Sequence, residues 1–322
     1  DSDFDAVEKM QLAANGVIYQ IGIWTGQPIA EAQENGAYTV IDNGILTKLQ
    51  SQAEILGGKI GVTNFDGNSP INILLNAPII DAAVVDYTLM PDLSTFDFPK
   101  VSIFLGQGAA DTVHTVQLAL IKSNSVSPHY VQVGNIGALL ACYAVAPAEE
   151  SIGHVENFNL RAVMTQAELG FGNVTLNAAK DAFADTVAFN NIKSIGYSKR
   201  NSKIHQKGYN FLCNYPDYEN GIFFSKDQTL SSGDYRTVSR CRVMHKSRRV
   251  VRFSLLPLIN ATSDVNASTG YLADADITII KNTVYAAIDN NMVDPGTTTS
   301  QISGRTVSID ATQNVIQNDQ LL

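Results

Sequence analysis

Long apolar runs are missing from this sequence of 322 residues. A helix that spans a bilayer needs roughly 18–20 consecutive apolar residues. The longest apolar stretches here are shorter and interrupted, as in GALLACYAVAPA at 137–148, where Pro147 falls within the run. No basic and then apolar leader opens the chain, which begins at Asp1 rather than at Met. We therefore expect a protein that does not insert into a membrane, and a chain that has been trimmed or processed.

Cysteine is scarce, and its spacing excludes the common kinds of cysteine chemistry. The three cysteines, Cys142, Cys213 and Cys241, lie far apart in the sequence. An odd and unclustered set forms neither a disulfide framework nor a Cys-x-x-Cys motif, and it is typical of a reducing compartment. We expect buried, neutral thiols.

Recognisable metal and catalytic motifs are also absent from the sequence. The five histidines do not pair at the spacing of metal ligands: His114, His129, His154, His205 and His245. No Gly-x-Ser-x-Gly elbow and no recognisable acid–base pair of carboxylates occurs. The sequence therefore predicts no catalytic residue, no metal and no cofactor, and a protein that is not an enzyme.

One stretch keeps an enzymatic alternative open. GQGAAD at 106–111 follows a predicted strand and precedes a predicted helix, which is the context in which backbone amides bind phosphate. The third glycine of the usual fingerprint is missing from it. A cytosolic α/β enzyme with a phosphate site at this turn is therefore one alternative function.

The composition is that of a folded protein. Hydrophobic residues make up 45% of the chain and charged residues 16%, which excludes a disordered chain. The length suits one large domain or two of ordinary size. We expect an N-terminal α/β part at 1–190 and a C-terminal part at 191–322, and the two can form one compact unit.

Strand and helix patterns alternate along the chain, which predicts a mixed α/β fold with a mixed sheet flanked by helices. Strands are predicted at 15–24, 35–44, 71–80, 101–106, 154–160 and 305–322. Helices are predicted at 45–58, 111–123, 136–147, 177–192, 238–258 and 274–293. The region 209–235 is rich in aromatic residues and turn signals, which is typical of short strands.

Charge is distributed unevenly along the sequence. The chain has 22 Lys and Arg against 31 Asp and Glu, a net charge of -9. Residues 193–252 contain 13 of the basic residues and only four acids, so this window carries +9. The remainder, with 9 basic and 27 acidic residues, carries -18. Such a chain attracts an acidic partner or another copy of itself.

The basic window is densest over 239–260, where SRCRVMHKSRRVVRFSLLPLIN contains no acid. Helical spacing places the apolar residues Val238, Cys241, Met244, Val251, Leu255 and Leu258 along one stripe. The basic residues then form a candidate subunit or tube interface: Arg240, Arg242, Lys246, Arg248, Arg249 and Arg252. Two alternatives remain open, a solvated cationic surface and a nucleic-acid-binding protein that uses the 236–252 helix. The negative net charge argues against nucleic acid as a partner.

The sequence around this helix carries a family pattern. It includes KGYNFLCNYPDYENGIFFSKDQTL at 207–230, an arginine-rich helix, and LLPLIN at 255–260. The matching positions are Gly208, Tyr209, Tyr215, Pro216, Asn220, Gly221, Phe223, Phe224, Asp227, Thr229, Arg240, Arg249, Leu256, Pro257, Ile259 and Asn260. This pattern resembles the C-terminal region of contractile tail sheath proteins, which form the sheaths of contractile bacteriophage tails and of related injection particles. The small-residue stretch at 136–155 is similar to smaller sheath homologues.

The resemblance implies a structural subunit of a virion tail or injection particle. Such subunits form hexameric rings stacked helically around an inner tube, and the stack contracts to drive the tube through a target envelope. The implied partners are further copies of the chain, the inner tail tube protein, and baseplate and terminator proteins, with assembly in the bacterial cytoplasm. Family members are linked by terminal arms that add strands to a neighbour's sheet. Because the sequence ends at NDQLL, we expect a sheath-type subunit whose linking arms are missing or trimmed.

Overall fold

The computed structural model describes most of the elements that the sequence predicts. The described residues are 5–14, 18–24, 30–32, 38–40, 43–57, 71–78, 91–106, 136–163, 206–213, 221–258, 261–294 and 298–312. The chain divides into two compact units. The first unit comprises Asp1–Ala146 and Glu150–Cys241, and the second comprises Pro147–Glu149 and Arg242–Leu322. The boundary expected at 190–191 lies outside the described residues and stays a prediction.

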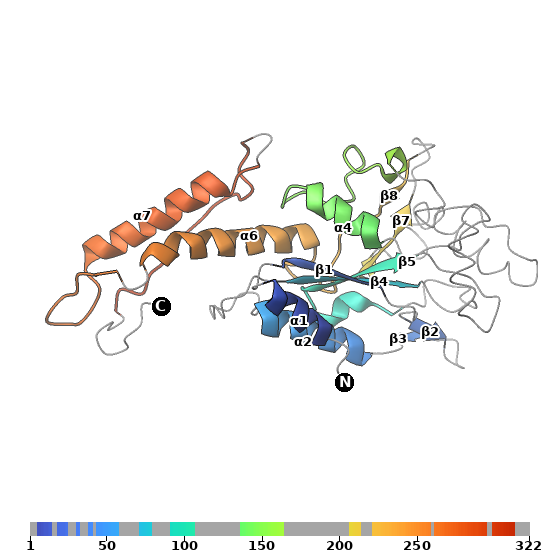
Figure 1. Ribbon diagram of the computed structural model, residues 1–322, viewed down its shortest axis with the longest axis horizontal. Helices are drawn as coiled ribbons and strands as arrows, with labels where there is room; N and C mark the ends of the chain where they lie inside the picture. The colour runs from blue at the N-terminus through green and yellow to red at the C-terminus, as the bar shows by residue number, and fades with distance from the viewer. Residues whose placement is uncertain are drawn as a thin grey trace, which may run out of the picture. The chain divides into compact units, whose positions relative to one another are not determined.

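A parallel sheet forms the centre of the first unit (Figure 1). Its strand order is β1-β4-β5-β6, and each neighbouring pair is parallel. The strands are β1 (Gln20–Trp24), β4 (Asn72–Pro78), β5 (Val101–Gly106) and β6 (Tyr209–Asn210). Continuous apolar runs suit such strands because both faces of a parallel sheet are covered. The predicted strands at 15–24, 71–80 and 101–106 are therefore confirmed.

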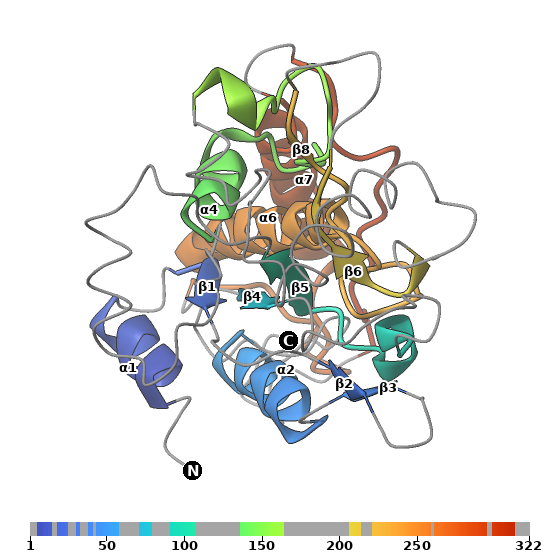
Figure 2. The ribbon, with the colours of Figure 1, turned by 90° about the vertical axis from the view of Figure 1, so that its right-hand side faces the viewer.

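Helices cover both faces of this sheet, which confirms the predicted mixed α/β fold. Figure 2 shows α4 (Ile136–Val145) on one face, and α1 (Asp5–Ala13) and α2 (Asn43–Gly57) on the other. The α2 residues that pack on the sheet follow helical spacing: Leu46, Leu49, Ala53 and Leu56. On the opposite face α4 lies very close to β1 at Gly22, because a Cβ atom there would be 2.7 Å from Cγ1 of Ile136.

Two antiparallel pairs and two short 3₁₀ helices complete the described part of the first unit. The pairs are β2 (Ala30–Ala32) with β3 (Tyr38–Val40), and β7 (Leu212–Cys213) with β8 (Phe223–Phe224). The 3₁₀ helices are η3 (Leu93–Phe96) and η5 (Leu160–Ala162). The short strands expected around 209–235 are present as β6, β7 and β8.

The strand predicted at 154–160 is wrong, because this segment forms turns that lead into η5. The amide of Phe158 donates to the carbonyl oxygen of His154 at 3.0 Å. The side chain of Asn159 accepts from the amide of Arg161 at 3.1 Å and caps η5. Local side-chain bonds of this kind compete with strand pairing, and the alternating pattern alone does not reveal them.

The second unit contains most of α6 (Val238–Leu255), then η8 (Leu256–Leu258) and α7 (Asp274–Asn291). The first turn of α6 belongs to the first unit. Val284, Ile288 and Met292 form the buried core of the second unit. The partly buried residues packed on this core are Val243, Val250, Val251, Leu255, Ile302 and Val307. The helices predicted at 238–258 and 274–293 are therefore confirmed.

The remaining sequence predictions have mixed outcomes. In the predicted strand at 305–322, the described residues 305–312 form no strand, so that part of the prediction is wrong. The helices predicted at 111–123 and 177–192 lie outside the described residues, as do 107–111 of the GQGAAD stretch. All three cysteines are free and buried, as expected.

The start of α6 is fixed by a buried carboxylate. Oδ2 of Asp227 accepts from the amide of Ser239 at 3.0 Å, and Oδ1 accepts from the hydroxyl of Ser151 at 2.9 Å. The backbone oxygen of Asp227 also accepts from the amide of Val238 at 2.7 Å. Thr237 Oγ1 accepts from the amide of Arg240 at 3.3 Å. The first amides of a helix have no partner within it, so these acceptors stabilise the start of α6.

Replacing this carboxylate tests its contribution to stability. We expect Asp227→Ala to lower the free energy of unfolding by about 1–3 kcal/mol, because it leaves the buried Ser239 amide without its acceptor. Asp234→Ala is the matched control, since Asp234 is exposed and lies just before the same helix. Urea unfolding followed by circular dichroism measures both. An equal effect of the two substitutions would contradict the role assigned to Asp227.

The turn before β6 requires a glycine. Gly208 has a φ of +86°, and a Cβ atom there would lie 3.3 Å from the amide nitrogen of Ser94. We expect Gly208→Ala to destabilise the protein by about 1–2 kcal/mol, because side-chain-bearing residues are strained at positive φ. Gly137→Ala is the control: it lies in α4 with no atom within 4 Å of the added carbon. Alanine is a better helix former than glycine, so this change should raise the melting temperature.

Candidate interface on helix α6

The six basic residues predicted as an interface all lie on α6, but their surroundings differ. Arg240 is exposed and belongs to the first unit. Its Nη1 donates to the backbone oxygen of Asp234 at 3.1 Å. This contact ties the guanidinium to the turn before the helix while the side chain stays accessible to solvent.

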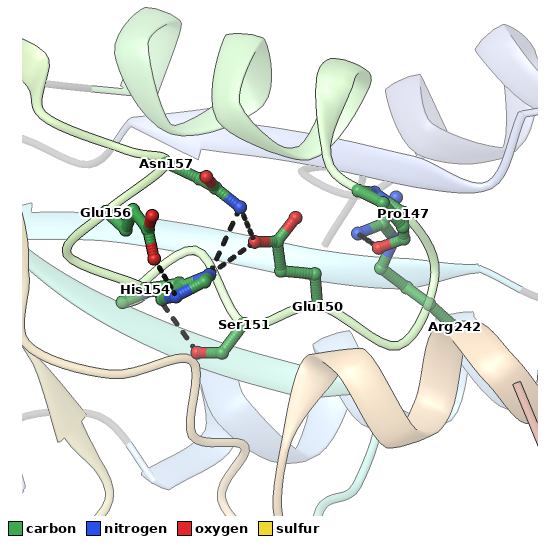
Figure 3. Close-up of polar contacts among 8 residues, drawn as sticks. Pro147, Glu150, Ser151, His154, Glu156, Asn157 and Arg242 are labelled. Carbon is green, nitrogen blue, oxygen red and sulfur yellow. Dashed lines mark hydrogen bonds and ion pairs between the residues drawn. The ribbon is translucent and has the colours of Figure 1, made fainter. Parts of the chain in front are cut away.

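Arg242 and Lys246 are held by their own unit. Nη1 of Arg242 donates to the backbone oxygen of Pro147 at 3.1 Å (Figure 3). Nζ of Lys246 donates to the backbone oxygen of Val293 at 3.3 Å and to Oε1 of Gln301 at 2.6 Å. Nε2 of Gln301 in turn donates to Glu149, at 2.6 Å. The two cations therefore link α6 to the segments before and after it within the second unit.

Acidic residues of the second unit provide part of the negative charge that balances the basic residues of α6, as the pKa of Lys246 shows. Burial lowers the pKa of Lys246, and Arg249 lowers it further. Glu149 and Asp294 act in the opposite direction and raise it. Within the second unit as a whole, seven basic residues stand against eight acidic ones, a balance of -1. The basic helix is therefore partly compensated by acids of its own unit, which its sequence alone does not show.

Arg248, Arg249 and Arg252 lie further along the helix and are half-buried. They occupy the last two turns of α6, beyond the contacts to Pro147 and Gln301. The structure thus brings all six predicted residues onto one helix. Their role as an interface stays a prediction.

The apolar stripe predicted for α6 is correct in part. Val238 and Cys241 are buried, and Val251 and Leu255 pack on the core beside α7. Met244 is 39% exposed, so its placement on a buried stripe is wrong. His245, one position further on, is buried instead. The buried positions of the first turns follow the spacing 238, 241, 245, which is the regular spacing of one helix face.

Two exposed apolar residues near the end of α6 were not among the predicted site residues. Phe253 is 71% exposed, and Leu256, at the start of η8, is 42% exposed. At 100° per residue, Phe253 lies about 200° around the helix from Val251 but about 60° from Val250, at the edge of the side that packs on the core. An aromatic residue off the predicted stripe was the signal that could have identified this position.

A separate polar cluster occurs in the first unit, in the loop after α4. Oε1 of Glu150 lies 2.6 Å from Nδ1 of His154 and also accepts from Nδ2 of Asn157 (Figure 3). Nε2 of His154 lies 4.0 Å from a carboxylate oxygen of Glu156. Ser151 in the same loop donates to Asp227. The cluster thus stabilises the loop that supports the start of α6.

The described residues offer no other recognisable site. Among them, no group of three or more His, Cys, Asp or Glu side chains is placed to hold a metal ion. None of the helices in this part of the chain combines the length and the apolar character that crossing a bilayer requires.

Comparison with known proteins gives little further information. No protein-family model matches the chain, and no curated protein matches its sequence. Among solved structures, one similar chain comes from the cryo-EM structure of the anti-feeding prophage (AFP) baseplate, 6-fold symmetrised. The identity is 12% and the TM-score 0.34, and the alignment covers 79% of this chain and 60% of that chain. This chain therefore spans less than two thirds of the length of the chain it matches, and a likeness at this level supports no argument about function.

The buried thiol of α6 predicts a loss of stability at alkaline pH. Burial, with a smaller effect of Asp227, raises the pKa of Cys241 from 9.0 to about 12. The unfolded thiol loses its proton near pH 9 while the folded thiol keeps it, so the folded state binds more protons. The stability from this group is fully present below pH 9 and is lost as the pH rises to about 12.

We expect the unfolding free energy of the wild type to fall between pH 8 and pH 10.5 more steeply than that of Cys241→Ala. One proton contributes at most about 1.4 kcal/mol per pH unit, so the difference should be about 1–2 kcal/mol over this range. Urea unfolding at several pH values measures it. Parallel pH profiles would show that Cys241 does not titrate differently in the two states.

Proposed function

We propose that the protein is a structural subunit of a contractile injection system, and specifically of its sheath. In this role it polymerises as stacked hexameric rings around an inner tube and contracts to drive the tube through a target envelope. It acts without a catalytic residue, metal or cofactor, and it assembles in the bacterial cytoplasm. Its partners are further copies of itself, the tube protein, and baseplate and terminator proteins.

The observation that supports this proposal most is the structural part played by the residues that resemble sheath proteins. Gly208 forms the turn before β6, and Tyr209 is buried and donates from its hydroxyl to the backbone oxygen of Pro91 at 3.0 Å. Phe223 and Phe224 form the buried strand β8. The Phe224 ring meets Phe104 of the central sheet edge to face, with centroids 5.7 Å apart.

The same stretch leads directly to the basic helix. Asp227 caps α6, and the buried Thr229 donates to the backbone oxygen of Tyr235 at 2.7 Å. The resembling residues that the structure describes between 208 and 229 therefore connect the edge of the sheet, the β7–β8 pair and the start of α6. Residues in such buried and bonded positions are the ones that two proteins with the same framework would share. A resemblance limited to surface residues would support the proposal less.

The charges of α6 suit a polymer. A single exposed ion pair contributes only about 0–1 kcal/mol, but equivalent contacts repeated along a stack act together because each ring positions the next. Contacts of this strength allow subunits to exchange one packing for another as rigid bodies. The free energy for contraction would be the difference between the two packings, and no nucleotide is consumed at the sheath.

The test changes Arg248, Arg249 and Arg252, the three predicted interface residues nearest the end of α6. We expect reversal of all three to Glu to leave a folded monomer and to abolish tubule formation or tube binding, since each contact would become repulsive. Negative-stain microscopy and sedimentation measure assembly, and circular dichroism measures folding.

The matched control reverses three exposed basic residues of the first unit, Lys9, Lys48 and Arg161, which produces the same change in net charge. This variant should assemble like the wild type. Tubules of normal appearance from the α6 variant would refute the assigned interface. A full-length protein that remains a single particle at high concentration and does not bind any tube protein would refute the function itself.

A further inference from the structure

The end of α6 carries an exposed apolar patch framed by arginines. We define the Phe253–Leu256 patch by these two residues, which are 71% and 42% exposed. Positions three and four apart are neighbours on a helix surface. Arg249 therefore lies next to Phe253, and Arg252 next to Leu256. Both arginines are half-buried.

This patch lies at the edge of the side of α6 that packs on α7, because Phe253 follows Val250 by three positions. The side facing the core of the second unit contains Val250, Val251 and Leu255, which pack with Val284 and Ile288. Figure 1 shows α7 running alongside α6. Phe253 belongs to neither group of buried residues and is highly exposed. The helix therefore has an apolar surface that its own unit does not bury.

We propose that the Phe253–Leu256 patch docks onto a second copy of this chain, at an acidic surface formed by residues outside 193–252. This proposal rests on the proposed function, because it names the contact through which copies associate. Charge complementarity supports it: residues 193–252, which end one position before Phe253, carry +9, and the remainder of the chain carries -18. Every additional copy therefore brings an excess of acidic residues outside 193–252.

The two kinds of residue contribute differently to such a contact. Burial of an exposed Phe or Leu side chain removes apolar surface from water and supplies affinity. Arginine and aromatic residues at the centre of an interface are frequent sources of most of the binding energy. The arginines around the patch mainly set orientation and the rate of encounter, because exposed charges are screened by salt.

An anionic membrane is the competing partner, because a basic helix with an exposed Phe can also lie on a lipid surface. The net charge of -9 favours a second copy, since the acidic remainder of the chain is repelled by anionic lipid. The apolar area is also small. Among the described residues of α6 and η8 after Met244, the exposed apolar side chains are Phe253, Leu256 and Pro257. A membrane is therefore an outcome that the experiment tests.

The experiment compares self-association of the full chain in three forms by sedimentation velocity, over a range of protein concentrations and at two salt concentrations. The first form is the wild type, the second is Phe253→Ser with Leu256→Ser, and the third is Ile279→Ser. Ile279 is the matched control because it is 56% exposed and lies on α7 of the same unit. We expect the double variant to weaken association at least about tenfold, and the control to behave like the wild type.

Two further measurements complete the test. Phe253→Leu keeps an apolar side chain and should retain most of the association, and flotation with phosphatidylserine-containing vesicles should leave the wild type unbound. Equal association of the wild type and the double variant would overturn this proposal and leave the proposed function standing. Binding of the wild type to the vesicles with loss in the double variant would also overturn it. A wild type that stays monomeric at every concentration would refute the proposed function, and this inference with it.

Discussion

The buried carboxylate of Asp227 is the contact on which the arrangement around α6 depends. It accepts from the Ser239 amide in the first turn of the helix and from the Ser151 hydroxyl in the loop after α4. A negative charge suits this place because the first amides of a helix have no acceptor within it and carry a partial positive charge. Low dielectric surroundings strengthen such a bond and make its loss costly. The carboxylate thus fixes where α6 begins.

Once the start of α6 is fixed, the basic residues fall into groups with different surroundings. Arg242 and Lys246 hold backbone oxygens and an amide of their own unit, and Glu149 and Asp294 act electrostatically on Lys246. A cluster that looks uncompensated along the sequence is therefore partly compensated in space. Phe253 and Leu256, which are exposed near the end of the helix, are the better candidates for contact with another molecule.

The sequence predicts the fold better than it predicts the site, and particular residues show why. The strand at 101–106 has its predicted bounds, because its short length and its β-branched and aromatic residues distinguish such an apolar run from a helix. The strand predicted at 154–160 is wrong because Oδ1 of Asn159 accepts from the nearby amide of Arg161 and from the amide of Ile222, contacts that no periodicity encodes. On α6 the helix and its buried Val238 and Cys241 could be predicted from spacing. The exposure of Met244 and Phe253 could not, because it depends on which sides of the helix other segments cover.

Salt distinguishes the two contributions that α6 can make to an assembly. Ion pairs at a surface weaken as ionic strength rises, because the screening length falls to about 8 Å at physiological salt. Burial of apolar surface does not weaken in this way, and some salts strengthen it. A contact built from arginines alone would therefore lose affinity as the salt concentration rises. A contact built from apolar residues alone would lack a fixed orientation. A helix that offers Phe253 and Leu256 next to Arg249 and Arg252 combines both, which would suit the proposed sheath role, in which one packing of subunits replaces another.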